Sequence, residues 1–178
     1  MAGKASEPTV KAPEGVGSAK ARPSSIQVVE FLLGNEHFAI DLFDVKEVVE
    51  YTTITKLPNT EEYIRGIIDL RGEITTIIDL KHRLNITKNI DVAAESSRII
   101  VLDTKIIGKK IGILVDDVTS VSTFEGGQVD YTSTSASDKS TAILGIIKRK
   151  VKVKDKEKNE LIIWIDIKQL LGDINSSV

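Results

Sequence analysis

Apolar and polar residues alternate along most of this chain, and the alternation begins abruptly at Ile26. In an extended strand, side chains two residues apart share one face, so a period of two indicates β-structure with one buried side. The apolar positions of residues 26–33 and of residues 38–42 follow this period on either side of Gly34-Asn35. A glycine-containing dipeptide between two such runs predicts an opening β-hairpin.

The same alternation continues to the end of the chain. Two apolar runs, Ile64–Leu70 and residues 74–79, flank a tight turn at Arg71-Gly72-Glu73. Further strands are predicted at residues 98–103, 110–115, 118–124, 142–153 and 160–166. Ile and Val dominate these runs, and β-branched side chains favour sheets. The chain is therefore predicted to be all-β.

Three aspartates each end an apolar run and precede a predicted helical turn. An aspartate in this position accepts hydrogen bonds from free amides two or three residues further on. Asp41 is predicted to cap a short helix in which Leu42, Val45, Val48 and Val49 share one face. Asp79 is predicted to cap residues 80–84, and Asp166 to cap residues 167–171.

The repeated capping pattern predicts two similar halves. Each half is expected to be a small β-barrel, because closing a sheet removes its exposed edges, and the two barrels are expected to share a hydrophobic core. The first barrel is predicted at roughly residues 26–85, the second at roughly 98–166, and a closing helix at 167–171. Residues 1–25 and 173–178 are predicted to be tails, the former disordered. Residues 126–140, rich in Ser, Thr and Gly, are expected to form a long loop.

The composition excludes several classes of protein. The net charge of −2 gives no overall attraction to nucleic acids or acidic membranes. Without cysteine there are no disulfides, thiolate metal sites or cysteine nucleophiles. The first 25 residues lack the apolar core of a signal peptide, and no run approaches the roughly 18 apolar residues of a membrane helix. These features predict a cytoplasmic protein.

No set of residues with catalytic spacing is visible. The two histidines are His37, at the start of a strand, and His82, between Lys81 and Arg83, and neither position by itself makes a general base. Asp116-Asp117 is the most suggestive carboxylate pair, but adjacent side chains of a strand point to opposite faces, so a polar turn is expected there. The sequence therefore predicts no enzymatic activity, no cofactor and no metal site.

A lysine stripe offers a second reading of the function. Lys148, Lys150, Lys152 and Lys154 recur at period two and are expected on one strand face, with Val151 and Val153 opposite. A nucleic-acid-binding β-barrel is one alternative, although Trp164 is the only aromatic residue nearby and such barrels stack bases on aromatic rings. A solvated hairpin that protects its own strand edges is the other.

Arg71 is the residue that turn chemistry explains least. A guanidinium at a hairpin tip is a directional donor for a carboxylate, a carbonyl or a partner surface, although a solvated turn arginine fits as well. Glu47, in the predicted first helix, lies between Lys46 and Val48 and is expected to point away from the face of Val45. Together Arg71 and Glu47 place opposite charges on the first half.

The turn and its flanking strands resemble the signature of the CheW-like chemotaxis coupling proteins. In that family a Gly-x-x-Asn-Leu-Arg-Gly run leads into an apolar strand that ends in Asp-Leu. The matching residues here are Gly66, Leu70, Arg71, Gly72, Asp79 and Leu80. Asp69 replaces the usual Asn, and Thr76 replaces the usual Pro. The resemblance extends from the opening hairpin to the closing strand and helix at residues 161–171.

The resemblance implies two five-stranded Src-homology-3-like barrels and a non-enzymatic adaptor. It implies two partners: the regulatory domain of a CheA-type histidine kinase and the cytoplasmic tip of methyl-accepting chemoreceptors. Arg71 matches the signature arginine, and Val45 and Glu47 match positions that the family uses in partner contact. With 178 residues the chain has no room for a phosphotransfer or ATP-binding domain, so a stand-alone coupling protein in receptor arrays is expected.

Overall fold

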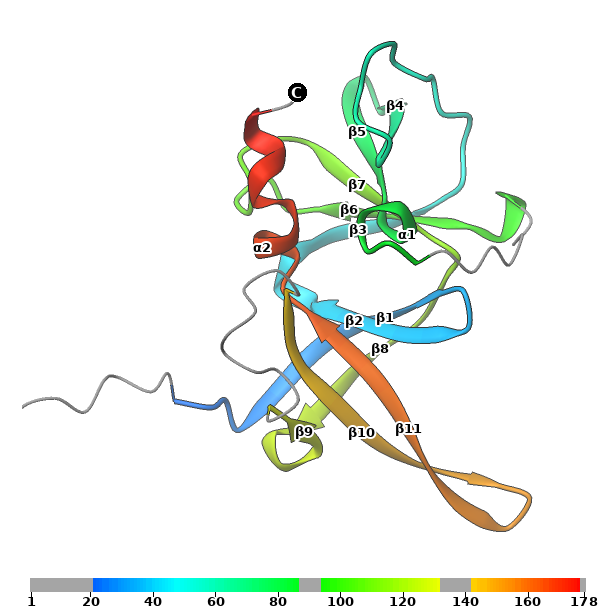
Figure 1. Ribbon diagram of the computed structural model, residues 1–178, viewed down its shortest axis with the longest axis vertical. Helices are drawn as coiled ribbons and strands as arrows, with labels where there is room; N and C mark the ends of the chain where they lie inside the picture. The colour runs from blue at the N-terminus through cyan, green and yellow to red at the C-terminus, as the bar shows by residue number, and fades with distance from the viewer. Residues whose placement is uncertain (1–20, 87–93, 132–141, 177–178) are drawn as a thin grey trace, which may run out of the picture.

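The computed structural model describes residues 21–86, 94–131 and 142–176. Most of these residues lie in strands, which form two sheets stacked one above the other in Figure 1. The predicted β-class is confirmed. The sheets have six and five strands rather than five each.

The larger sheet has the strand order β8-β1-β2-β11-β10-β9. Its strands are β1 (Ser25–Leu33), β2 (Glu36–Asp41), β8 (Asp117–Glu125), β9 (Val129–Asp130), β10 (Ile143–Val153) and β11 (Lys156–Ile165). Neighbouring strands are antiparallel except β2 and β11, which pair in parallel. This parallel pair joins the two ends of the chain in one sheet.

The smaller sheet has the strand order β3-β6-β7-β5-β4. Its strands are β3 (Val45–Glu50), β4 (Ile64–Leu70), β5 (Glu73–Asp79), β6 (Arg98–Leu102) and β7 (Ile111–Val115). Here the parallel pair is β5 and β7. The smaller sheet therefore consists entirely of the middle of the chain.

Short helices close the strands. They are α1 (Leu80–Arg83), α2 (Ile167–Leu171) and the 3-10 helices η1 (Leu42–Asp44), η2 (Ala94–Ser96), η3 (Gly126–Gln128) and η4 (Gly172–Ser176). The three predicted aspartate caps are confirmed: Asp41 accepts from the amide of Phe43 at 2.9 Å, Asp79 from that of His82 at 3.2 Å and Asp166 from that of Gln169 at 3.1 Å. None of these helices has the length and apolarity needed to cross a bilayer.

The main hydrophobic core lies between the two sheets and is shared by both, as predicted. It includes Phe31 and Ile40 from the larger sheet, Ile78 and Ile113 from the smaller sheet, and Leu171 from α2. Each of these side chains is fully buried. A second cluster, which contains Val28, Ile147 and Trp164, covers another part of the larger sheet, and a third, around Ile77 and Ile99, belongs to the smaller sheet.

The predicted division into consecutive halves is wrong. β1 and β2, assigned to a first barrel at residues 26–85, belong to the same sheet as β8–β11, whereas β6 and β7, assigned to the second barrel, belong with β3–β5. Alternation identifies strands and their local hairpins, but it carries no information on which distant strands pair. The parallel pairs β2–β11 and β5–β7 decide the partition.

The predicted helix at residues 42–49 is also wrong beyond its first turn. Asp41 caps only the 3-10 helix η1, and Val45–Glu50 form strand β3, in which partly buried and exposed residues alternate. Val45, Val48 and Val49 are β-branched and fit a strand better than a helix. Glu47 is therefore a strand residue that pairs with Val101 of β6.

The predicted boundaries need smaller corrections. Strand β1 already begins at Ser25, which pairs with Glu125, while residues 1–20 lie outside the described residues. The predicted C-terminal tail at 173–178 begins inside η4, and Ile174 is fully buried in the main core. The predicted loop at 126–140 begins with η3 and β9, and its residues 132–140 lie outside the described part of the chain.

Candidate functional site

The β4–β5 turn has an unusual backbone at Arg71. Leu70 pairs with Glu73, so the loop has two residues, and both have positive φ, 55° at Arg71 and 81° at Gly72. This is the turn that matches the twist of a hairpin, but Asn or Gly normally occupies its first position. Asp69 supports the turn, because its carboxylate accepts a hydrogen bond from the amide of Gly72 at 2.7 Å.

The guanidinium of Arg71 binds the carboxylate of Glu47 through two hydrogen bonds. Nη1 donates to Oε1 at 3.1 Å and Nη2 to Oε2 at 2.6 Å. The Arg71 side chain is 71% exposed, whereas that of Glu47 is 21% exposed. A two-point contact fixes the orientation of the planar group. The tip of the hairpin thus presents an arginine that is both exposed and held in place.

This ion pair joins opposite edges of the smaller sheet. Glu47 lies on edge strand β3, and Arg71 follows the other edge strand, β4. The chain after β3 also returns to β4, where Thr55 forms a bridge with Ile67. Gly66 permits this approach: its φ is +143°, and a Cβ there would lie 2.2 Å from the carbonyl oxygen of Thr55. The signature glycine thus allows the chain after β3 to pair with β4.

Val45 takes no part in the ion pair. It lies two residues before Glu47 on β3, pairs with Leu102, and packs half-buried against the main core. Strand β3 and the β4–β5 hairpin each carry one large exposed apolar residue. These are Val48 on β3, 41% exposed, and Ile74 on β5, 59% exposed. The structure therefore brings together two of the three predicted site residues, while Val45 supports the strand that carries one of them.

Two neighbouring carboxylates have shifted pKa values. A hydrogen bond from Lys110, 2.6 Å away, lowers the pKa of Glu73 at the end of the turn. Burial raises the pKa of Asp44, just before β3, against the opposing hydrogen bond from Lys168. Among the described residues, neither carboxylate forms a hydrogen bond or ion pair with Arg71.

Asp116 has a structural role that the sequence analysis did not identify. It is buried, accepts a hydrogen bond from the amide of Gly34 at 2.6 Å, and forms an ion pair with Lys81 at 2.7 Å. It thereby ties the β1–β2 turn of the larger sheet to α1, which follows the smaller sheet. The prediction of a polar turn named the right position, but no sequence signal pointed to Lys81. Across the described residues, no group of three or more His, Asp or Glu side chains is arranged to hold a metal ion.

Comparisons with known proteins agree with the fold. The model of the CheW-like domain matches residues 27–175. The chain is similar to the chemotaxis protein CheW of Klebsiella aerogenes, with 32% identity over 147 residues, which are 80% of this chain and 79% of the relative. It is also similar to the chemotaxis protein CheW of Thermotoga maritima, with 30% identity over 148 residues, covering 83% of this chain and 89% of the relative.

A solved structure gives the same result. The crystal structure of the scaffolding protein TtCheW from Thermoanaerobacter tengcongensis superposes with a TM-score of 0.67 and is 34% identical in sequence. The superposition covers 86% of this chain and 97% of that protein. Together with the match over residues 27–175, this shows that the chain belongs to the CheW-like domain family.

Proposed function

We propose that this CheW-like chain is a non-enzymatic adaptor of chemotaxis signal transduction that couples methyl-accepting chemoreceptors to a CheA-type histidine kinase. Its relatives are named chemotaxis proteins, and its structural neighbour is named a scaffolding protein. An adaptor of this kind works in the cytoplasm, bound to receptor arrays through its partners. None of the similar proteins described above is named as a nucleic-acid-binding protein, so the second reading of the lysine stripe gains no support.

The exposed Arg71–Glu47 pair is the observation that supports a protein-docking site at this position. Glu47 uses two donors of the guanidinium, on Nη1 and Nη2. A guanidinium has five N–H donors, so Arg71 keeps others for a carbonyl or carboxylate of a partner. Because Glu47 fixes the side chain before binding, little side-chain entropy is lost when the contact forms. Ile74, on the strand that follows the Arg71 turn, adds exposed apolar area.

The proposal is tested with variants that separate the turn, the pair and the partner contact. Arg71→Asn removes the guanidinium and introduces a residue that tolerates positive φ. The free energy of unfolding of this variant should therefore stay within about 1 kcal/mol of the parent value. Binding to the purified regulatory domain of the kinase, or to a soluble receptor-tip fragment, should weaken about ten- to a hundred-fold. Isothermal titration calorimetry measures both affinities.

The exchanged variant Arg71→Glu with Glu47→Arg is the decisive control. It restores an ion pair within the protein but presents the opposite charges to a partner. We expect it to keep the stability of the parent and to bind both partners as weakly as Arg71→Asn. If the exchange restores binding, the pair acts only within the fold and the docking proposal is wrong. The control Lys56→Thr replaces an exposed lysine that is not a hydrogen-bond partner of Arg71 or Glu47, and this variant should bind like the parent.

A further inference from the structure

The β10–β11 hairpin extends well beyond the rest of the larger sheet (Figure 1). It pairs with other strands only near its root: Ile146 and Ile147 of β10 face β9, and residues 162–164 of β11 face β2. Residues 148–161 form what we call the distal ribbon. In the described part of the chain, no other strand pairs with either edge of this ribbon.

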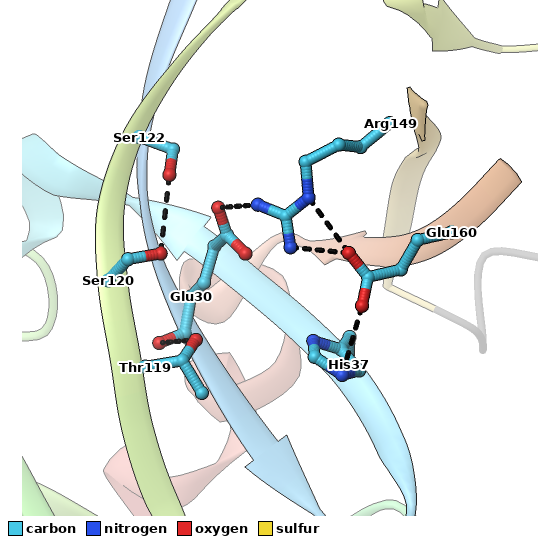
Figure 2. Close-up of polar contacts among 7 residues, drawn as sticks. All are labelled: Glu30, His37, Thr119, Ser120, Ser122, Arg149 and Glu160. Carbon is cyan, nitrogen blue, oxygen red and sulfur yellow. Dashed lines mark hydrogen bonds and ion pairs between the residues drawn. The ribbon is translucent and has the colours of Figure 1, made fainter. Parts of the chain in front are cut away.

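Arg149 clamps the root of the ribbon (Figure 2). Its Nη1 donates to Oε1 of the fully buried Glu30 on β1 at 2.8 Å, and its Nε donates to Oε2 of Glu160 on β11 at 2.8 Å. The other oxygen of Glu160 lies 3.3 Å from Nε2 of His37 on β2. Burial alone would lower the pKa of Arg149, but the hydrogen bonds and charges of Glu160 and Glu30 outweigh it and raise the pKa. Arg149 therefore stays charged, and its charge is paired with the carboxylates of Glu30 and Glu160 within the protein.

The lysines beyond the clamp are not neutralised in this way. Lys148 forms an ion pair with Asp130 at 2.8 Å. Residues 150–158 contain five lysines and two carboxylates, and among the described residues none of these five lysines has an ion-pair partner. Lys150 and Lys152 share a strand face with Lys148, and Val151 and Val153 lie on the opposite face. Strand β10 forms one edge of the ribbon, and on one of its faces Lys150 and Lys152 continue the row that begins at the paired Lys148, with Glu157 of β11 opposite Lys152.

We propose that the open edge of β10 at residues 148–153 binds an extended acidic segment of a protein partner by strand addition. Free N–H and C=O groups at a sheet edge are matched by the backbone of an added strand, which a lipid surface or a nucleic acid cannot supply. A strand with carboxylates two residues apart places them beside Lys150 and Lys152, and opposite charges on adjacent strands stabilise the pairing. The clamp at Arg149 holds the ribbon in position before the partner arrives.

This site is separate from the Arg71–Glu47 pair, which belongs to the other sheet. The proposal therefore goes beyond the adaptor function and does not depend on it. A partner could bind the ribbon while the kinase or a receptor occupies the first site.

The test uses the full chain and a fluorescein-labelled peptide in which glutamate and threonine alternate over nine residues. A control peptide has the same charge but carries proline at the central threonine, which removes a ladder donor and disfavours strand addition. Fluorescence anisotropy at low salt should show binding of the first peptide and about tenfold weaker binding of the second. Lys150→Thr with Lys152→Thr should weaken binding of the first peptide by about tenfold, because two opposite-charge pairs are lost. Lys56→Thr should leave binding within twofold.

Three outcomes would overturn the proposal. The first is no binding of the alternating peptide above that of the proline peptide, since charge alone would then explain the attraction. The second is an equal loss of affinity for the alternating peptide in Lys56→Thr and in the double variant Lys150→Thr, Lys152→Thr. The third is tighter binding of the parent to phosphatidylserine vesicles or to duplex DNA than to the alternating peptide, with the same dependence on Lys150 and Lys152. Slower amide exchange at residues 148–153 in the presence of the alternating peptide would support it directly.

Discussion

The β4–β5 and β10–β11 hairpins have similar turns in very different surroundings. Both close with a two-residue loop in which both residues have positive φ, Arg71-Gly72 in one and Lys154-Asp155 in the other. Arg71 and Lys154 carry long side chains that disfavour this conformation, whereas Asp155 tolerates it better. At the first turn, Arg71 reaches back to Glu47 on the far edge of the sheet. At the second, the described residues show no ion pair for Lys154, and both tip residues are exposed.

The difference lies in what each hairpin packs against. Strand β5 is central in its sheet, between β4 and β7, and carries fully buried Ile77 and Ile78. The distal part of β10–β11 has strands only within the hairpin and is exposed at nearly every residue. The first hairpin therefore holds its tip arginine against the body of the protein. The second is held at its root by the contacts of Arg149 with Glu30 and Glu160, and its distal strand edges are exposed to solvent.

The largest expected effect tests the packing half of the comparison. Ile78→Ala truncates a fully buried side chain in the core that both sheets share. It should lower the free energy of unfolding by roughly 2–5 kcal/mol, because apolar burial is lost and a cavity is left. Val153→Ala, in the exposed ribbon, should change it by less than about 0.5 kcal/mol. Urea unfolding followed by circular dichroism measures both. Equal losses would show that the ribbon packs as tightly as the core hairpin.

The next effect tests the clamp. Arg149→Met leaves the carboxylate of buried Glu30 without its cation and should cost about 2–3 kcal/mol, less than a fully buried pair because the Arg149 side chain is 30% exposed. Adding Glu30→Gln to Arg149→Met should recover part of this loss, since no unpaired buried charge then remains. Chemical unfolding of the two single variants and the double variant gives the coupling energy. Additive losses would mean that the two side chains do not depend on each other.

The smallest effect tests the turns themselves. Replacing Lys154-Asp155 by Asn-Gly should stabilise the ribbon by about 0.5–1 kcal/mol, because these residues accept positive φ with less strain. At the other turn, Arg71→Asn should gain from the same relief but lose the ion pair with Glu47, and so change stability less. Native-state amide exchange of each hairpin measures the local effect. If Arg71→Asn gains as much as the ribbon change, the ion pair contributes nothing to holding the first turn.

Much of the secondary structure was predictable from local sequence patterns. The alternation located every strand of four or more residues apart from β3, and the aspartate caps located both α-helices. The turn at Arg71-Gly72 was predicted from glycine and its flanking strands. In each case the determining interactions lie within a few residues of one another in sequence, so the sequence pattern records them.

β3 shows where local reasoning fails. Val45, Val48 and Val49 are compatible with one helical face, and Asp41 does cap a turn, so two valid signals favoured a helix. The strand forms because its backbone pairs with β6, whose residues lie about fifty positions further along the chain. Tertiary pairing outweighs a short helical pattern, because four or five residues of helix have little stability of their own.

The sequence by itself determined the strands, the capped turns and the arginine at a hairpin tip, since these follow from side-chain period and backbone preference. Only the tertiary structure decided that β2 and β11 join the chain ends in one sheet, that Arg71 meets Glu47 from 24 residues away, and that Arg149 meets Glu30 from 119 residues away. Such contacts depend on the curvature and packing of two complete sheets. No local pattern encodes them, because each partner alone is an ordinary charged residue on a strand or turn.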